Sequence, residues 1–175
     1  MMGRSWDVVR SLKCEQARTC YNAAMNVEPF VYRRLVQFAD TDLAGIVHFS
    51  SLFRIMEEAE HAFLRSLGLT VYEPGGTGVT WPRVWANANF YNPARFEDEL
   101  EVHVAISAMT HKAVTYDFLV AIGEREIAHG AITAVCCRYE DVDGKRRLKS
   151  TPIPAEMADK FRSFVPQETE DSDAE

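Results

Sequence analysis

The sequence predicts an α+β protein in which an antiparallel β-sheet covers one long helix. Residues 51–67 carry apolar side chains at spacings of three and four, which is typical of a helix with one buried face. Four strand-like stretches then follow one another without a second long helix. Adjacent strands that follow a single helix favour this class. The 175 residues, 47% of them hydrophobic, suit one domain with tails.

The first expected strand lies before the helix. In an extended chain, alternate side chains point to the same face. Phe30, Tyr32, Val36 and Phe38 then share one face, with Arg34 as the exception. This stretch is therefore expected to be the first strand.

The helix is expected over residues 51–67. Its apolar positions are Leu52, Ile55, Met56, Ala59, Phe63 and Leu67. Glu57, Glu58 and Glu60 are interpreted as part of its solvated face. Gly68 is expected to end the helix, and a glycine-rich loop covers residues 74–78.

The later strands are expected to form the sheet. Residues 99–107 and 113–122 alternate apolar and polar side chains, and residues 126–139 form a long apolar run with β-branched members. The Asp-Gly pair at 143–144 is a turn signal before a short strand at 145–148. These stretches predict consecutive antiparallel hairpins.

The two ends differ from the middle. Residues 154–164 suggest a short helix that begins on a proline. Residues 1–28 are expected to be a disordered or weakly helical extension, or to reflect a start assigned before the true one at Met25. Residues 166–175 are acidic with few apolar side chains, so a flexible tail is expected. The domain is expected over residues 29–165.

Composition excludes several classes of function. The net charge of −7 argues against nucleic acid as a partner, although an anionic small molecule remains compatible with it. No apolar run of about 18 residues is present, so no membrane partner is expected. A cytoplasmic location is expected because the first 25 residues lack signal-peptide features. Cys14, Cys20, Cys136 and Cys137 lack metal-ligand spacing and are interpreted as reduced thiols.

Residues 36–49 hold the strongest candidate site. Within a dozen residues they combine the Asp42 carboxylate, a bend at Gly45, the His48 imidazole and the start of a helix. A carboxylate can attack a carbonyl or activate water, and free N–H groups at a helix start can stabilise an oxyanion. This combination suits attack on an activated carbonyl.

These residues carry a family resemblance. Residues 38–42, Phe-Ala-Asp-Thr-Asp, and 44–47, Ala-Gly-Ile-Val, precede a helix containing Glu57 and Ala59. This pattern resembles the signature of the 4-hydroxybenzoyl-CoA thioesterase family of hot-dog-fold proteins. Residues 92–100, Asn-Pro-Ala-Arg-Phe-Glu-Asp-Glu-Leu, resemble a later segment of that family. The match covers about residues 29–160.

The resemblance implies a curved antiparallel sheet wrapped around a central helix. It also implies a homodimer that pairs sheets edge to edge, or a homotetramer, with acyl-CoA sites between subunits. Asp42 is implied as the nucleophile or general base, and the backbone N–H of Phe49 as the oxyanion donor. No metal and no cofactor are expected, because coenzyme A is part of the substrate.

Other site positions follow from the same motif. Gly45 and Val47 are expected to lie against the substrate. Ser51 is expected to cap the helix beside it, with Ser50 as the alternative cap. His48 departs from the tyrosine or tryptophan of many relatives. It is assigned to the catalytic group, where it would orient Asp42 or water or contact the acyl group; a partly buried structural histidine is the alternative. Asp40 is interpreted as structural.

Coenzyme A phosphates require positive charge. Lys112 lies where the family places nucleotide-binding residues, and Arg146, with Arg147 and Lys149, forms a second basic cluster. Each is assigned to substrate binding; a charged hairpin tip, or contact with a carrier protein, is the alternative. A helix glutamate, Glu57 or Glu58, facing substrate is a weaker alternative to Asp42.

The resemblance predicts hydrolysis of an acyl-CoA thioester to the free acid and coenzyme A. Residues 38–42 and 90–94 are also similar to enzymes acting on 1,4-dihydroxy-2-naphthoyl-CoA, which makes an aromatic specialist one alternative. Trp81, Trp85 and Phe90 are expected either in an acyl pocket or in the core. A non-hydrolytic acyl-CoA-binding protein and a hot-dog dehydratase are further alternatives, because a fold alone does not assign chemistry.

Overall fold

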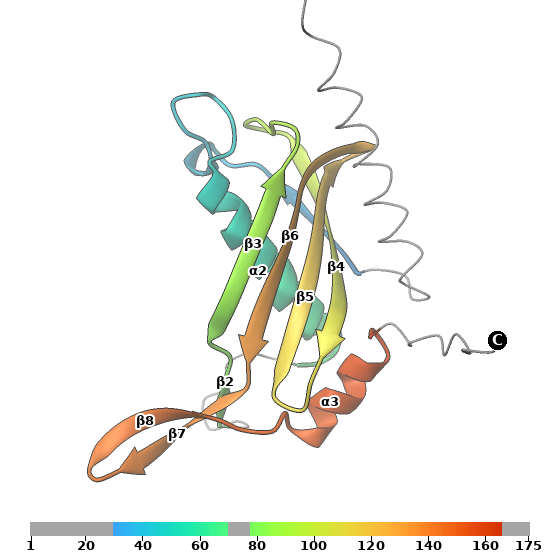
Figure 1. Cartoon of the computed structure of the whole chain (residues 1–175). Helices are drawn as coiled ribbons and strands as arrows, with labels where there is room; N and C mark the ends of the chain where they lie inside the picture. Colours follow the sequence, from blue (N-terminus) through green and yellow to red (C-terminus); the bar gives the residue numbers. More distant parts are fainter. Residues whose placement is uncertain (1–29, 70–77, 166–175) are drawn as a thin grey trace, which may run out of the picture.

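A computed structural model describes residues 30–69 and 78–165 (Figure 1). The expectations for residues 1–28 and 166–175, and for most of the glycine-rich loop, lie outside these ranges. Eleven elements follow one another in the described chain: β1 (Phe30–Leu35), η1 (Phe38–Asp40), α2 (Phe49–Ser66), β2 (Val79–Thr80), β3 (Arg83–Phe90), β4 (Glu99–Met109), β5 (Ala113–Ile122), β6 (Arg125–Val135), β7 (Cys137–Val142), β8 (Lys145–Ser150) and α3 (Ala155–Arg162).

A five-stranded antiparallel sheet forms the body, in the order β1-β4-β5-β6-β3. It curves around α2, which lies along one face (Figure 1). Core side chains from the sheet, such as Tyr116, Phe118 and Ile132, and from α2, such as Ile55 and Phe63, belong to one buried cluster. The predicted α+β class, with an antiparallel sheet wrapped around one long helix, is confirmed.

The ends of α2 explain its length. The helix begins at Phe49, two residues before the predicted start, because His48 caps it. It ends as predicted before Gly68, whose φ of +66° suits glycine. Gly68 N–H donates to Arg65 O, and Leu69 N–H donates to Leu64 O, which satisfies the last carbonyls in a Schellman motif.

Gly130 on β6 allows α2 to lie close to the sheet. A Cβ atom at this position would stand 2.8 Å from Met56 Cε on α2 and 2.9 Å from the carbonyl oxygen of Asn87 on β3. Real side chains do not tolerate such distances. The missing side chain therefore sets the spacing between helix and sheet.

Two predictions of secondary structure are corrected, and one strand was missed. Phe38 is not on the first strand; β1 ends at Leu35 and the Phe38 ring, 78% exposed, belongs to the short 3-10 turn η1. The single strand expected over 126–139 is two, β6 and β7, separated at Cys136, whose N–H donates to Lys112 O. The strand β3 was not predicted.

A second, smaller sheet has the order β2-β7-β8. Its β7–β8 hairpin turns at Asp143 and Gly144, as predicted. The hairpin projects from the body beyond Arg83, the first residue of β3 (Figure 1). We call this hairpin, residues 137–150, the arm. Within residues 30–69 and 78–165, no helix is long and apolar enough to cross a membrane.

Candidate active site

A cleft of about 500 Å³ opens at the N-terminal end of α2. It lies between the loop that follows η1, the first turns of α2 and the segment that follows β3. Its walls are mostly apolar: Asp42, Ile46, Val47, Phe49, Leu52, Phe90, Tyr91, Asn92, Pro93, Ala94 and Ile127. Asp42, Val47 and Phe49, three of the predicted site residues, thus meet in one place, and Asp42 is the one carboxylate in this wall.

The Asp42 loop is closed at its base by a bridge between Thr41 and Val47. Asp42 N–H donates to Ile46 O at 3.1 Å, and Gly45 N–H donates to Asp42 O at 2.9 Å. Gly45 has a φ of +71°, so this tight turn requires a residue that adopts the left-handed region. Gly45 therefore shapes the loop, although it does not line the cleft.

The Asp42 carboxylate is held but exposed. Its Oδ1 accepts one hydrogen bond from Ala44 N–H at 2.8 Å. The side chain belongs to the cleft wall and no arginine or lysine among the described residues pairs with it. An unneutralised carboxylate at the cleft surface is available to attack a carbonyl or to take a proton from water.

The start of α2 supplies a hydrogen-bond donor. Phe49 is the first residue of the helix, where N–H groups have no intrahelical partner. Among the described residues, none accepts a hydrogen bond from Phe49 N–H. This donor lies in the same cleft wall as Asp42 and at the positive end of the helix dipole. The arrangement can stabilise negative charge on a carbonyl oxygen.

His48, rather than Ser51, caps the helix. Its Nδ1 accepts from Ser50 N–H at 3.4 Å and lies 2.8 Å from Ser50 Oγ. Its ring packs against the Phe49 ring in a tilted arrangement, with the ring centroids 4.5 Å apart. Ser51 is buried in the first turn and lies outside the cleft wall. The cap predicted for Ser51 is therefore wrong. Among the described residues no hydrogen bond joins His48 to Asp42, and the role of His48 in the reaction stays a prediction.

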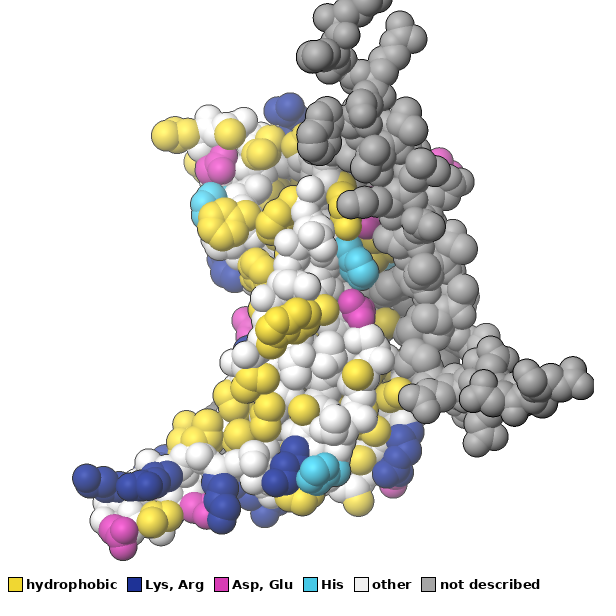
Figure 2. All heavy atoms as spheres, viewed as in Figure 1, with side chains coloured by type: hydrophobic (Ala, Val, Ile, Leu, Met, Phe, Trp, Pro, Cys, Tyr) yellow, Lys and Arg dark blue, Asp and Glu magenta, His cyan; other side chains and the backbone are white. Residues whose placement is uncertain are grey.

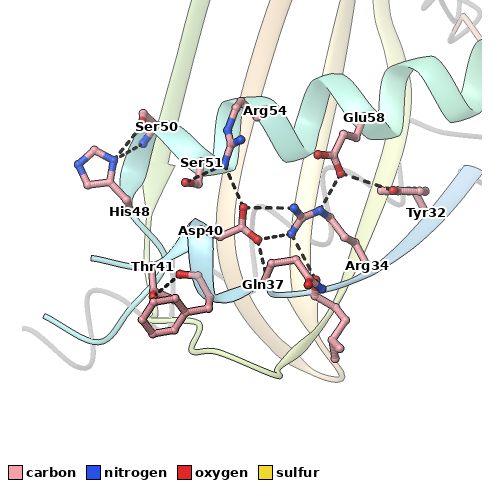
Figure 3. Close-up of polar contacts among 12 residues, drawn as sticks. Tyr32, Arg34, Gln37, Asp40, Thr41, His48, Ser50, Ser51, Arg54 and Glu58 are labelled. Carbon is pink, nitrogen blue, oxygen red and sulfur yellow. Dashed lines mark hydrogen bonds and ion pairs between the residues drawn. The ribbon is translucent and has the colours of Figure 1, made fainter. Parts of the chain in front are cut away.

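A buried polar network lies beneath the loop (Figure 3). The Asp40 carboxylate accepts from Arg34 Nη1 at 2.5 Å and Nη2 at 3.2 Å, and from Arg54 Nη2 at 3.0 Å. Gln37 N–H donates to it at 2.8 Å. Arg34 Nε also bonds Glu58 at 2.7 Å. Although burial opposes the charge, the Arg34 hydrogen bonds lower the pKa of Asp40 and keep it ionised.

The other wall of the cleft is the segment after β3. Val47 N–H donates to Ala94 O at 2.8 Å, which joins this segment to the Asp42 loop. Asn92 Nδ2 donates to Glu126 O at 2.6 Å and fixes the segment to β6. Of the three aromatics proposed for an acyl pocket, only Phe90 lines the cleft. Trp81 is buried in the core and the exposed Trp85 lies on β3.

The predicted phosphate-binding residues lie elsewhere. Lys112 is in the β4–β5 turn and Arg146 is on the arm, both at the end of the sheet opposite Phe90 (Figure 1). Figure 2 shows basic side chains gathered on the arm. Arg146 stacks over Tyr139 at 4.2 Å. One chain therefore does not bring these residues to Asp42, and their role stays a prediction.

Glu60 is a buried group that the sequence interpretation missed. It was assigned to a solvated face, but it is 1% exposed and pairs with Arg83 at 2.7 Å. Burial raises its pKa to about 7. Its spacing from Met56 and Phe63 puts it on the apolar side of α2, and that spacing was the available signal.

Two other features bear on ligand chemistry. Within the part of the chain described, no three His, Cys, Asp or Glu side chains are arranged to hold a metal ion. Cys136 and Cys137 are buried free thiols, while Cys14 and Cys20 lie outside the described residues.

A sheet wrapped around one helix, with a carboxylate loop before the helix start, defines the class of hot-dog thioesterase-fold proteins. Residues 36–161 match the family described as the Thioesterase-like superfamily, and the chain belongs to it.

Named relatives fall in the same class. A 1,4-dihydroxy-2-naphthoyl-CoA hydrolase of Synechococcus elongatus is 26% identical over 133 residues, 74% of this chain and 93% of the relative. The crystal structure of a 1,4-dihydroxy-2-naphthoyl-CoA thioesterase from Synechocystis matches with a TM-score of 0.69, 25% identity and coverage of 77% and 96%. A gentisyl-coenzyme A thioesterase structure matches with a TM-score of 0.65, 29% identity and coverage of 75% and 99%.

Proposed function

We propose that this protein hydrolyses acyl-CoA thioesters to a free acid and coenzyme A, with Asp42 as the reacting carboxylate. The observation that carries the proposal is the presence of Asp42 and the free Phe49 N–H in one apolar cleft. Membership of a thioesterase family supports hydrolysis over simple binding. Fold alone would not assign the reaction.

The reaction follows from these two groups. The Phe49 N–H would bind the thioester oxygen as it gains charge, which lowers the barrier to attack on the carbonyl carbon. Asp42 would either attack that carbon, giving a mixed anhydride that water then hydrolyses, or remove a proton from an attacking water. In both routes the C–S bond breaks, the thiolate of coenzyme A leaves and takes a proton, and one water is consumed.

An aromatic acyl group is a narrower candidate within the same reaction. The relatives named for 1,4-dihydroxy-2-naphthoyl-CoA and gentisyl-CoA carry the names of aromatic acyl-CoA thioesters, and this chain resembles 4-hydroxybenzoyl-CoA thioesterases in residues 38–47. Phe90 and Tyr91 line the cleft and can stack on a ring. These observations favour an aryl substrate over a long alkyl chain.

We further propose a homodimer whose sites lie between subunits. β3 is an edge strand with one unpaired side in the described sheet, and its Val84 and Trp85 are exposed. Antiparallel pairing of two β3 strands would bring the Arg83 end of one copy beside the Phe90 end of the other. The arm of one copy would then lie near the cleft of the other. There Arg146 on the arm and Lys112 at its base could bind the phosphates of coenzyme A.

The experiment is release of coenzyme A from short, long and aromatic acyl-CoA thioesters. Wild type, Asp42→Asn and Asp159→Asn are compared; Asp159 is an exposed carboxylate on α3, away from the cleft. Turnover by wild type and Asp159→Asn but not by Asp42→Asn is expected. No turnover on any thioester, with coenzyme A still bound, would instead support a binding protein.

A further inference from the structure

Asp40 makes contacts that reach both parts of the reacting site. Its carboxylate is 2% exposed and receives hydrogen bonds from Arg34 on β1, from Arg54 on α2 and from the backbone of Gln37. Its carbonyl oxygen accepts the N–H of His48 at 2.8 Å. One residue therefore holds a strand, a turn, a helix side chain and the helix cap together (Figure 3).

Both reacting groups are close neighbours of these contacts in the chain. Asp42 is two residues after Asp40, and Phe49 is next to His48. The Thr41–Val47 bridge closes the loop between them. Any change in how Asp40 is held would therefore move the Asp42 loop relative to the start of α2. Catalysis is sensitive to such movement, because misplacement by about 1 Å can cost a hundredfold in rate.

We propose that Asp40 is a positioning residue of the reaction, which sets the Asp42 carboxylate against the Phe49 N–H through its bonds to Arg34, Arg54 and His48. This inference rests on the proposed function of Asp42. Asp40 thus does more than stabilise its surroundings. Without its carboxylate the substrate cleft persists, but Asp42 and the Phe49 N–H lose their relative placement. Asp40 itself is absent from the cleft wall.

The negative charge of Asp40 is essential to this role. Arg34 is largely buried, and its remaining ion-pair partner, Glu58, is 41% exposed at its side chain. An amide at position 40 would retain one oxygen as acceptor but present an NH2 group to a second donor. Arg34 or Arg54 would then lose its partner, and the loop would be free to shift.

The test compares kcat and KM for Asp40→Asn, Arg54→Gln and Arg54→Lys on the acyl-CoA that wild type turns over fastest. Glu101→Gln is the matched control, because it also removes a carboxylate paired with a β1 arginine, Arg33, and this carboxylate is on the neighbouring strand β4. Asp40→Asn is expected to lower kcat about 10- to 100-fold with KM within about twofold of wild type. Glu101→Gln should keep wild-type kcat.

Arg54→Gln covers the case in which Asp40→Asn does not fold, because Arg54 is 60% exposed at its side chain. The kcat of Arg54→Gln should fall, although its melting temperature should equal that of Glu101→Gln. Arg54→Lys should restore part of the lost kcat. Wild-type kcat in folded Asp40→Asn or in Arg54→Gln, or a rise in KM alone, would overturn the inference. Full activity of Asp42→Asn would reject the proposed function itself; an inactive Asp42→Asn beside a fully active Asp40→Asn would reject only the role of Asp40.

Discussion

The Glu60 carboxylate on α2 lies 2.7 Å from the guanidinium of Arg83 at the start of β3, inside the layer between helix and sheet. Arg83 also donates to Trp81 O at 2.6 Å. The pair joins the far half of α2 to the strand that is proposed to form the dimer edge. Removing one partner of such a pair would leave an uncompensated buried charge.

The first prediction concerns stability against pH. The pKa of Glu60 is about 7 in the folded protein, whereas its ordinary value is 4.5. Between pH 4.5 and 7 the folded state therefore binds more protons than the unfolded state. The free energy of unfolding should therefore fall as pH rises from 4.5 to 7, by at most about 1.4 kcal/mol per unit. Urea unfolding of wild type and Glu60→Gln at a series of pH values measures this effect. The difference between their free energies of unfolding should change between pH 4.5 and 7. A constant difference would contradict the prediction.

The second prediction concerns Gly130. Gly130→Ala should destabilise the protein by about 1–3 kcal/mol, because its Cβ would meet Met56 and the Asn87 carbonyl oxygen. Thermal unfolding of Gly130→Ala, Met56→Ala and the double variant measures the effect. The double variant should recover only part of the loss due to Gly130→Ala, since the backbone oxygen stays in place. A neutral Gly130→Ala would show that the helix moves away from the sheet at little cost.

The third prediction separates backbone strain from function at the Asp42 loop. Gly45 and Gly144 have φ values of +71° and +70°, with open space at both Cβ positions. Alanine at either site should cost about 1 kcal/mol of stability. Gly45→Ala should also lower kcat, whereas Gly144→Ala, at the tip of the arm, should not. Equal kcat values for the two variants would contradict the prediction, because the conformation of the Asp42 loop would then have no effect on the reaction.

The fourth prediction concerns the dimer edge. Val84→Lys on β3 should shift the protein towards monomer and reduce turnover, because an unpartnered ammonium would enter the strand pairing. Val31→Lys is the control, since Val31 is exposed on β1 at the opposite edge of the sheet. Sedimentation velocity and turnover report both effects. A dimer with full activity in Val84→Lys would place the interface elsewhere.

The fifth prediction concerns the arm. Arg146→Gln should raise KM for acyl-CoA with little change in kcat, because a phosphate contact supports binding equally in the ground and transition states. The effect should diminish at high salt. Lys160→Gln, which removes a cation of α3 paired with Glu156, is the control. An unchanged KM in Arg146→Gln would leave the arm without a part in coenzyme A binding.

Local patterns predicted most of the secondary structure. The period of α2, the glycine after it and the alternation in β4 and β5 depend on neighbouring residues, and each lies close to its predicted range. The edge strand β3 was not predicted because it is exposed along most of its length and lacks a clear apolar face. Its sequence is Arg-Val-Trp-Ala-Asn-Ala-Asn-Phe. The division at Cys136 depends on hydrogen bonds to distant residues, which no local pattern encodes.

The candidate site was predictable only in part. Residues 42–49 are consecutive, so the meeting of Asp42 with the helix start follows from local chain geometry. The opposite wall comes from Phe90 to Ala94 and depends on the tertiary fold. The cap at His48 was missed because serine is the commoner capping residue. The roles proposed for Lys112 and Arg146 rest on the proposed dimer, which a single chain does not display.

The most direct measurement is the release of coenzyme A thiol by wild type and Asp42→Asn on short, long and aromatic acyl-CoA thioesters, with binding of coenzyme A to each protein measured in parallel. The account predicts turnover by wild type, a loss of about a thousandfold or more in Asp42→Asn, and equal binding by both. Turnover by Asp42→Asn at the wild-type rate would contradict the account, because the reacting group would then lie elsewhere.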